Sequence, residues 1–269
     1  MTILEISELS ISIGGRTVVD AVSFTVQPGE SVGIIGESGS GKSLTLMAVL
    51  GLLPEAASVS GSIRFEGTEL LGGRERAWRR LRGDRLSCVF QEPQTALDPL
   101  SRIGAQLVSP VRARRSLSRA EARSLAVRLA TEVGLPQPEQ IVRRYPHELS
   151  GGQRQRVVIA MAMAASPALI LADEPTTALD ATVQAGVLDL LGRQLARTGA
   201  AMVLVTHDVG VAASRCEQLL VMRHGRVVER GVTHSVLTAP QHDYTRSLVD
   251  AAYATSWQAF PQVRELVPA

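Results

Sequence analysis

The sequence predicts an α/β fold built on a mostly parallel sheet, with a small antiparallel sheet near its beginning and a helical insertion in its middle. Three observations support this prediction. A glycine-rich loop separates the apolar strand SVGII from a helix, and the apolar runs ALILADE and AMVLVTHD flank a further helical pattern. Residues 95–142 carry almost no strand signal. Short apolar runs that alternate with helices are typical of parallel strands covered on both faces.

The signals for the antiparallel sheet lie in the first part of the chain. The stretches ILEISELSISIGG and SFTVQPGESVGIIG predict strands next to turns, the second turn at Pro28 and Gly29. GSIRFEGTEL predicts a further hairpin strand, and SLTLMAVLGLL has the length and apolar spacing of a helix. Later in the chain, QLLVMRHGRVVERG predicts a hairpin that turns near His224 and Gly225.

The middle of the chain predicts helices. SRAEARSLAVRLATEVGL is amphipathic, with Ser118 as a candidate N-cap and Glu121 three residues later. RQRVVIAMAMAA, ATVQAGVLDLLGRQLART and most of the end of the chain also predict helices. We therefore expect a main domain over residues 1–247, a helical subdomain within it at about 95–155, and a tail over 248–269.

Composition excludes several classes of protein. The formal net charge of +2 is too small to indicate a nucleic-acid partner. Two cysteines, Cys88 and Cys216, allow neither a disulfide framework nor a zinc site, so we expect reduced thiols. The beginning MTILEISELS lacks a signal-peptide pattern, and the apolar stretches are shorter than the ~20 residues of a membrane helix. We expect a soluble protein that reaches a membrane only through partners.

The segment GESGSGKS matches the phosphate-loop pattern G-x-x-x-x-G-K-[ST] between a strand and a helix. The glycines allow backbone N–H groups to surround phosphate oxygens, and the helix N-terminus adds its dipole. Lys42, the only lysine of the chain, would neutralise β- and γ-phosphates, and Ser43 would offer its hydroxyl to Mg²⁺. The predicted nucleotide-binding residues here are Gly36, Glu37, Ser38, Gly39, Ser40, Gly41, Lys42 and Ser43.

Polar residues follow three other apolar segments. Asp173 ends ALILAD and would reach Mg²⁺ through water or Ser43, while Glu174 would polarise the attacking water as a general base. His207 follows AMVLVT, and we expect it to contact the γ-phosphate because ligands gather at the carboxyl ends of parallel strands. Gln91, after CVF, is a weaker candidate for contact with Mg²⁺ or the water.

A second glycine-rich element, LSGGQ, opens the predicted helix RQRVVIAMAMAA. Its serine hydroxyl, glycine amides and helix N-terminus also suit a γ-phosphate. If the helical insertion projects from the core, this element cannot fold back on the chain's own nucleotide but can bind that of a second subunit. A glycine-rich helix cap without a ligand is the alternative interpretation.

The order of GESGSGKS, QEPQTALDP, LSGGQ, ALILADEP, TALD and THD closely resembles the ATP-binding subunits of ABC transporters, over about Ile3 to Ser247. The resemblance implies a RecA-like P-loop NTPase core with an antiparallel β-subdomain and a helical subdomain, which binds ATP and Mg²⁺. It also implies a dimer that holds ATP between its subunits, with Asp180 at the interface. The residues expected to contact the other subunit's nucleotide are Ser150, Gly151, Gly152 and Gln153.

The resemblance implies partners and a location as well. Two different ATPase subunits commonly pair in this family, so we expect a heterodimer, with a homodimer as the alternative. Import would require two transmembrane permease subunits, sensed by a loop that begins at Gln91, and an extracytoplasmic substrate-binding protein. The chain would lie peripherally on the cytoplasmic face of the cell membrane. The presence of Glu174 and His207 predicts an active ATPase rather than a purely regulatory subunit.

The segments ESGSGKSLT, YPHELSGGQRQRVVIAMA and QHDYTRSLV resemble the peptide/nickel importer group. Many peptide-transporting members carry a cysteine-rich stretch after the TRSLV-like segment, whereas this tail contains no cysteine. This difference favours ATP-driven import of nickel or a metal chelate, with an oligopeptide or dipeptide importer as the alternative. A soluble ABC ATPase acting on DNA or ribosomes is disfavoured, because the chain has neither a second cassette nor a long coiled-coil insertion.

One position departs from the family pattern. ABC ATPases usually place an aromatic residue early in the chain to stack on adenine, and LSISIGGR has Ile13 in that place. An aliphatic contact holds adenine less well than a stacked ring, so we expect weaker or less selective nucleotide binding unless a partner subunit supplies a ring.

Two arginine-rich stretches, Arg74–Arg85 and Arg112–Arg128, are interpreted as solvated helix faces. A membrane-proximal or partner surface is the second interpretation. Nucleic-acid binding is disfavoured because no aromatic residues alternate with the arginines, and aromatic residues make up only 3% of the chain.

Overall fold

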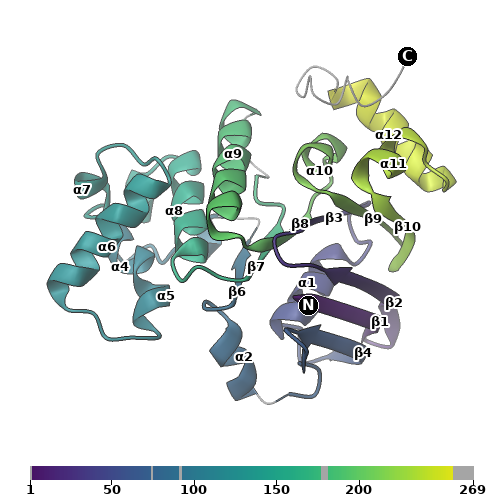
Figure 1. Ribbon diagram of the computed structural model, residues 1–269, viewed down its shortest axis with the longest axis horizontal. Helices are drawn as coiled ribbons and strands as arrows, with labels where there is room; N and C mark the ends of the chain where they lie inside the picture. The colour runs from purple at the N-terminus through teal and green to yellow at the C-terminus, as the bar shows by residue number, and fades with distance from the viewer. Residues whose placement is uncertain (1, 74, 91–92, 177–180, 257–269) are drawn as a thin grey trace. The chain divides into compact units, whose positions relative to one another are not determined.

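The computed structural model describes residues 2–73, 75–90, 93–176 and 181–256. The chain divides into two compact units, which are described separately. Unit 1 consists of Met1–Arg80 and Ala201–Ala269, and unit 2 consists of Leu81–Ala200. The second unit is therefore an insertion between two segments that fold together (Figure 1).

Unit 1 contains the predicted antiparallel sheet, with the strand order β2-β1-β4-β5. Its strands are β1 (Leu4–Ile13), β2 (Arg16–Val26), β4 (Ala57–Phe65) and β5 (Thr68–Glu69). Gly14 and Gly15 join β1 to β2 with φ values of 57° and 79°. Two successive positive φ values match the twist of a two-residue hairpin, which explains the glycine pair.

Four strands of a second sheet lie in unit 1, in the order β10-β9-β3-β8. They are β3 (Ser31–Ile35), β8 (Ala201–Val205), β9 (Gln218–Arg223) and β10 (Arg226–Val232). β3 pairs in parallel with both β8 and β9, while β9 and β10 form the predicted antiparallel hairpin. All five residues of β8 are buried, as expected for a strand covered on both faces.

The turn at Pro28 and Gly29 connects the two sheets of unit 1. Glu30 N–H donates to the Gln27 carbonyl at 3.1 Å, and Gly29 has a φ of 75°, which fits a type II turn. The sequence predicts a strand on each side of this turn, and the structure confirms both. However, β2 and β3 belong to different sheets and do not pair with each other as a hairpin.

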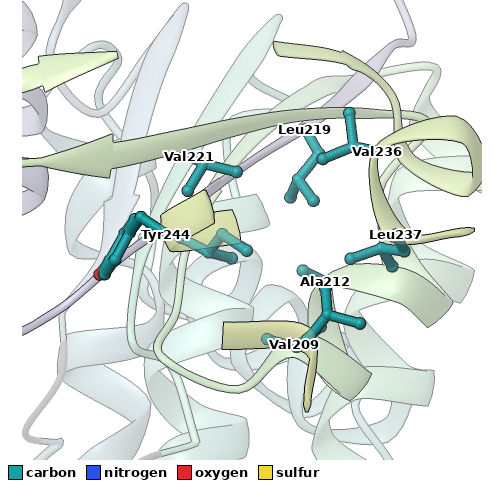
Figure 2. Close-up of a cluster of buried hydrophobic side chains, with 9 residues drawn as sticks. Val209, Ala212, Leu219, Val221, Val236, Leu237 and Tyr244 are labelled. Carbon is teal, nitrogen blue, oxygen red and sulfur yellow. The ribbon is translucent and has the colours of Figure 1, made fainter. Parts of the chain in front are cut away.

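The helices of unit 1 are α1 (Lys42–Leu50), α2 (Glu75–Leu81), α10 (Val209–Arg215), α11 (Thr233–Thr238) and α12 (Asp243–Ser256). α2 ends one residue inside unit 2. A cluster of buried side chains joins α10, α11 and α12 to β3 and β9 (Figure 2). Its members are Ile35, Val209, Ala212, Leu219, Val221, Val236, Leu237, Tyr244 and Val249. α12 thus shares a buried cluster with Ile35, the last residue of the strand that leads into the phosphate loop.

Unit 2 has two parallel strands, β6 (Leu86–Val89) and β7 (Leu169–Asp173), and is otherwise helical. The helices are α3 (Pro93–Ala96), α4 (Ile103–Leu107), α5 (Ser109–Arg112), α6 (Arg119–Glu132), α7 (Pro138–Ile141), the 3₁₀ helix η1 (Pro146–Glu148), α8 (Gly151–Met163) and α9 (Ala181–Thr198). Ser118 caps α6 and forms a reciprocal capping box with Glu121, as predicted. The helical character expected for the middle of the chain is confirmed.

The described residues contain no helix that is both long and apolar enough to cross a membrane.

The last helix of the described chain, α12, runs from Asp243 to Ser256. It therefore extends across the boundary at residues 247 and 248 that the sequence suggests for the main domain.

Candidate functional site

The phosphate loop lies between the end of β3 at Ile35 and the start of α1 at Lys42. Gly36, Gly39 and Gly41 have φ values of 150°, 80° and 98°, which side chains with a Cβ rarely adopt. A Cβ on Gly36 would lie 2.1 Å from the Met222 carbonyl oxygen. The glycine pattern is therefore required by the backbone conformation and by the close approach of β9.

The loop presents unpaired hydrogen-bond donors. Among the described residues, the backbone N–H groups of Ser38, Gly39 and Gly41 have no hydrogen-bond partner. α1 lacks a side-chain N-cap, and the buried hydroxyl of Ser40 also has no partner in the described part of the chain. Free amides at a helix N-terminus bind phosphate oxygens through hydrogen bonds and the helix dipole. These groups fit the phosphates of a nucleotide.

Lys42 supplies the positive charge of this loop. Its side chain is 5% exposed, and Nζ donates at 2.8 Å to the carbonyl oxygens of both Gly36 and Glu37. These bonds hold the ammonium group over the loop, where it would offset phosphate charge. Ser43 occupies the next position of α1 and is half-buried.

His207 lies at the same edge of the sheet as the phosphate loop. Ile34 of β3 is the register partner of Val205 of β8, and Thr206 N–H donates to the Ile34 carbonyl at 3.2 Å. Both strands run in parallel, so their carboxyl ends meet at one edge, as the sequence predicts. His207 is exposed there, two residues beyond the strand, and unit 1 therefore brings His207 and the phosphate loop to one edge.

Asp173 and Glu174 end β7 in unit 2. Asp173 is 8% exposed, while Glu174 is half-buried and has a φ of 45°. A left-handed conformation is uncommon for glutamate and is typical of residues held in place at functional sites. Burial, together with the charge of Asp173, raises the pKa of Cys88 on the neighbouring strand far above its ordinary value. Cys88 is therefore a neutral thiol.

The LSGGQ element is the N-terminus of α8 in unit 2. The Ser150 hydroxyl accepts from Gln153 N–H at 3.3 Å, and the Gln153 side chain accepts from Ser150 N–H at 3.0 Å. A Cβ on Gly152 would lie 2.6 Å from Cγ1 of Val183 on α9, so close helix packing requires this glycine. Ser150 and Gly151 remain exposed at the helix start. Ser150 therefore caps α8, and this cap leaves the N-terminus of the helix exposed.

Three predicted positions remain, of which one lies within the described residues. Ile13, expected near adenine, is the last residue of β1; it is half-buried and pairs with Arg16 and Ala57. Gln91 and Asp180 lie outside the described residues.

The second cysteine, Cys216, is not one of the predicted site residues. It is 7% exposed and packs beside Gly33 of β3. Burial, with a smaller contribution from the charge of Glu217, raises its pKa to about 12. Both cysteines are therefore protonated near neutral pH, as expected for packing residues.

The geometry divides the predicted residues between the two units. Unit 1 holds the phosphate loop and His207, whereas unit 2 holds Asp173, Glu174 and the α8 N-terminus.

No group of three histidine, cysteine or acidic side chains positioned for a metal occurs among the described residues. A hydroxyl, a carboxylate and phosphate oxygens are the hard ligands that Mg²⁺ prefers. Ser43 and Asp173 fit that chemistry.

Sequence reasoning missed one residue at the loop. Glu37 N–H donates to the hydroxyl of Tyr244 at 2.8 Å, although the two residues are 207 positions apart. The segment QHDYTRSLV contains Tyr244, but no local pattern in it indicates a contact with the loop.

Comparisons with known proteins show the family to which the chain belongs. The family model described as "ABC transporter" matches residues 19–177. The chain is 47% identical over 255 residues to the peptidoglycan transport ATP-binding protein YejF of Agrobacterium fabrum, covering 93% of this chain and 47% of the relative. It is 42% identical to the oligopeptide transport ATP-binding protein OppD of Salmonella typhimurium, covering 93% and 76%. The probable D,D-dipeptide transport ATP-binding protein DdpD of Escherichia coli is also 42% identical, with 99% and 84% covered.

Solved structures support the same assignment. The ATP-binding cassette MJ0796, in a dimeric post-hydrolysis state bound to ADP and Pi, aligns with a TM-score of 0.74 and 28% identity over 86% of this chain and 98% of that chain. The cbiO1 protein of Clostridium perfringens, with a TM-score of 0.75 and 24% identity over 98% of both chains, supports the fold alone. The α/β fold with its antiparallel sheet and helical part is confirmed. This chain belongs to the ABC transporter family and is an ATP-binding subunit with the fold and active-site motifs of an ABC ATPase.

Proposed function

We propose that this ATPase subunit powers peptide uptake through an ABC importer. The observation that carries the proposal is the similarity to OppD and DdpD, which are transport ATP-binding proteins for oligopeptides and D,D-dipeptides. Each match covers more than nine-tenths of this chain and more than two thirds of the relative. These relatives favour the peptide alternative over the nickel cargo that the cysteine-free tail suggested. We place the chain at the cytoplasmic face of the membrane as a peripheral subunit.

Some residues of the site bind the nucleotide or Mg²⁺, and others act on the attacking water or the γ-phosphate. The loop amides, Lys42 and the α1 N-terminus bind the nucleotide phosphates, with Ser43 and Asp173 as Mg²⁺ ligands. Bound Mg²⁺ offsets charge on the phosphate oxygens. Glu174 takes the proton of the attacking water, and His207 donates a hydrogen bond to the γ-phosphate. Gln91 completes the set next to Mg²⁺ or the water.

A second ATPase subunit completes each site. The exposed start of α8 offers backbone amides and the helix dipole to a nucleotide held by a partner. We infer that Ser150, Gly151, Gly152 and Gln153 act on the nucleotide of the other subunit, and that the dimer is a heterodimer. Two permease subunits and an extracytoplasmic substrate-binding protein complete the importer.

A pocket in unit 2 is suited to the permease contact. It has a volume of about 510 Å³, and arginines surround an apolar floor that includes Val108 and Ala126. These arginines are Arg102, Arg112, Arg123 and Arg143. Within the described part of the chain, the side chains of Arg112, Arg123 and Arg143 form no ion pair or hydrogen bond. An acidic, partly apolar helix of a permease subunit would complement this surface.

Replacing Glu174 with Gln tests the assignment of the base. The amide cannot accept the proton of water, so we expect hydrolysis by the assembled complex to fall by about 10²–10⁴-fold while ATP still binds and closes the dimer. Turnover and size-exclusion chromatography with ATP measure the two effects. Glu139→Gln, on the short helix α7, is the matched control. Unchanged turnover in Glu174→Gln would remove Glu174 from the mechanism.

Replacing Ile13 with Tyr tests the adenine contact. A stacked ring contributes ~1–3 kcal/mol to base binding, so the Kd for ATP should decrease at least fivefold, as an order-of-magnitude estimate. Titration of the full chain with ATP and GTP measures affinity and selectivity, with Ile13→Leu as the control without a ring. The role of Ile13 is contradicted if the native chain already binds ATP far more tightly than GTP and Ile13→Tyr changes neither affinity.

Reversing the charges of Arg112 and Arg123 tests the permease contact. The double change to Glu should weaken association with the permease subunits by about tenfold or more, because two of the four arginines then repel an acidic partner. Nucleotide affinity of the free chain should not change. Arg76→Glu on α2 controls for the loss of surface charge. Equal co-purification of the double variant and the native chain with the permeases would refute the contact.

Deleting the gene tests the cargo. We expect resistance to a toxic dipeptide and a toxic oligopeptide, with uptake of labelled nickel unchanged. The native chain should restore sensitivity, whereas Lys42→Ala should not, because the phosphates lose their buried cation. Lost nickel uptake with retained peptide sensitivity would instead establish the metal alternative.

A further inference from the structure

The start of α12 is fixed at a defined place in unit 1. Both oxygens of the Glu229 carboxylate, on β10, accept backbone hydrogen bonds, from Gln241 N–H at 2.8 Å and His242 N–H at 3.0 Å. Nδ1 of His242 accepts from Tyr244 N–H at 3.1 Å. These bonds satisfy donors that a helix start leaves unpaired. The first turn of α12 therefore has a fixed position relative to β10.

The ring of Tyr244 is held by an apolar cluster and by the guanidinium of Arg223. It is 5% exposed and belongs to the apolar cluster that also contains Ile35, the last residue before the phosphate loop. The Arg223 guanidinium lies over the ring, 4.8 Å from its centroid. Figure 2 shows the hydroxyl pointing away from the apolar cluster. A rigid ring with a fixed hydroxyl can position another group with little further loss of entropy.

The hydroxyl reaches the phosphate loop. It accepts a hydrogen bond from Glu37 N–H at 2.8 Å, while the carbonyl of the same residue accepts from Lys42 Nζ at 2.8 Å. Both backbone groups of Glu37 are therefore engaged at the point where the chain leaves β3. The free amides of Ser38, Gly39 and Gly41 follow directly. Burial raises the pKa of Tyr244, so the phenol stays neutral at physiological pH.

We propose that Tyr244 is a positioning residue for the phosphate loop. Its hydroxyl fixes the Glu37 amide and so holds the following amides and Lys42 in the arrangement that receives nucleotide phosphates. The C-terminal helix is thereby coupled to nucleotide affinity, although it contributes no group that touches the nucleotide. The coupling is independent of the cargo, because it acts on ATP binding alone.

The test is the affinity of the full chain for Mg²⁺-ATP in the Tyr244→Phe variant. This change keeps the ring, its packing and its contact with Arg223, and removes only the hydroxyl. One hydrogen bond of this kind corresponds to about a three- to tenfold change in an equilibrium constant. We expect Kd, measured by calorimetric titration, to rise by that factor with little change in Tm.

Val249→Ala separates positioning from general destabilisation. Val249 lies on the same helix and in the same buried cluster, and it makes no hydrogen bond from its side chain. Its truncation should lower Tm by several degrees and leave Kd unchanged. Tyr253→Phe, further along α12, controls for loss of a phenol that packs against the cluster and should leave Kd unchanged.

Either of two results would overturn the proposal. The first is a native Kd in Tyr244→Phe, which would show that the loop needs no help from the hydroxyl. The second is an equal rise of Kd in Val249→Ala, which would show that any weakening of the cluster has the same effect.

Discussion

The close packing of the phosphate loop against β9 and β2 is the constraint on which the site in unit 1 depends. The Met222 carbonyl occupies the space where Gly36 would carry a Cβ, and the Val18 carbonyl limits Gly41 and Gly225 in the same way. Any side chain at Gly36 would displace main-chain atoms rather than a flexible side chain. The neighbouring strands consequently restrict the loop to a conformation that only glycine adopts readily at these positions.

Burial of the single lysine follows from this geometry. An ammonium group that is 5% exposed requires strong acceptors, and the Gly36 and Glu37 carbonyls provide two. The compact Nζ suits this narrow position, whereas a planar guanidinium would need more room and more acceptors. Apart from the histidines, all other basic residues of the chain are arginines, so the phosphate loop holds the only ammonium side chain of the sequence. Phosphate charge would lie next to this buried ammonium group.

Unit 2, like unit 1, carries its candidate site residues at a strand end and at a helix start. In unit 2 these residues include two carboxylates rather than a lysine. Asp173 and Glu174 follow one another at the end of β7, yet Asp173 is buried and Glu174 adopts a left-handed backbone. Two adjacent carboxylates thereby have different surroundings. At α8, the capping box and the contact of Gly152 with Val183 stabilise the helix start without covering it. Structural capping and a role at a partner's nucleotide are therefore compatible.

The sequence by itself determined the features that depend on neighbouring residues. These include the turn at Pro28 and Gly29, the apolar strand before Asp173 and the capping box at Ser118, because turns and helix caps are local. Tertiary structure decided that β2 and β3 enter different sheets, and that Tyr244 meets Glu37. Such contacts depend on how strands and helices pack over long separations, and hydrophobic periodicity carries no information about which elements become neighbours.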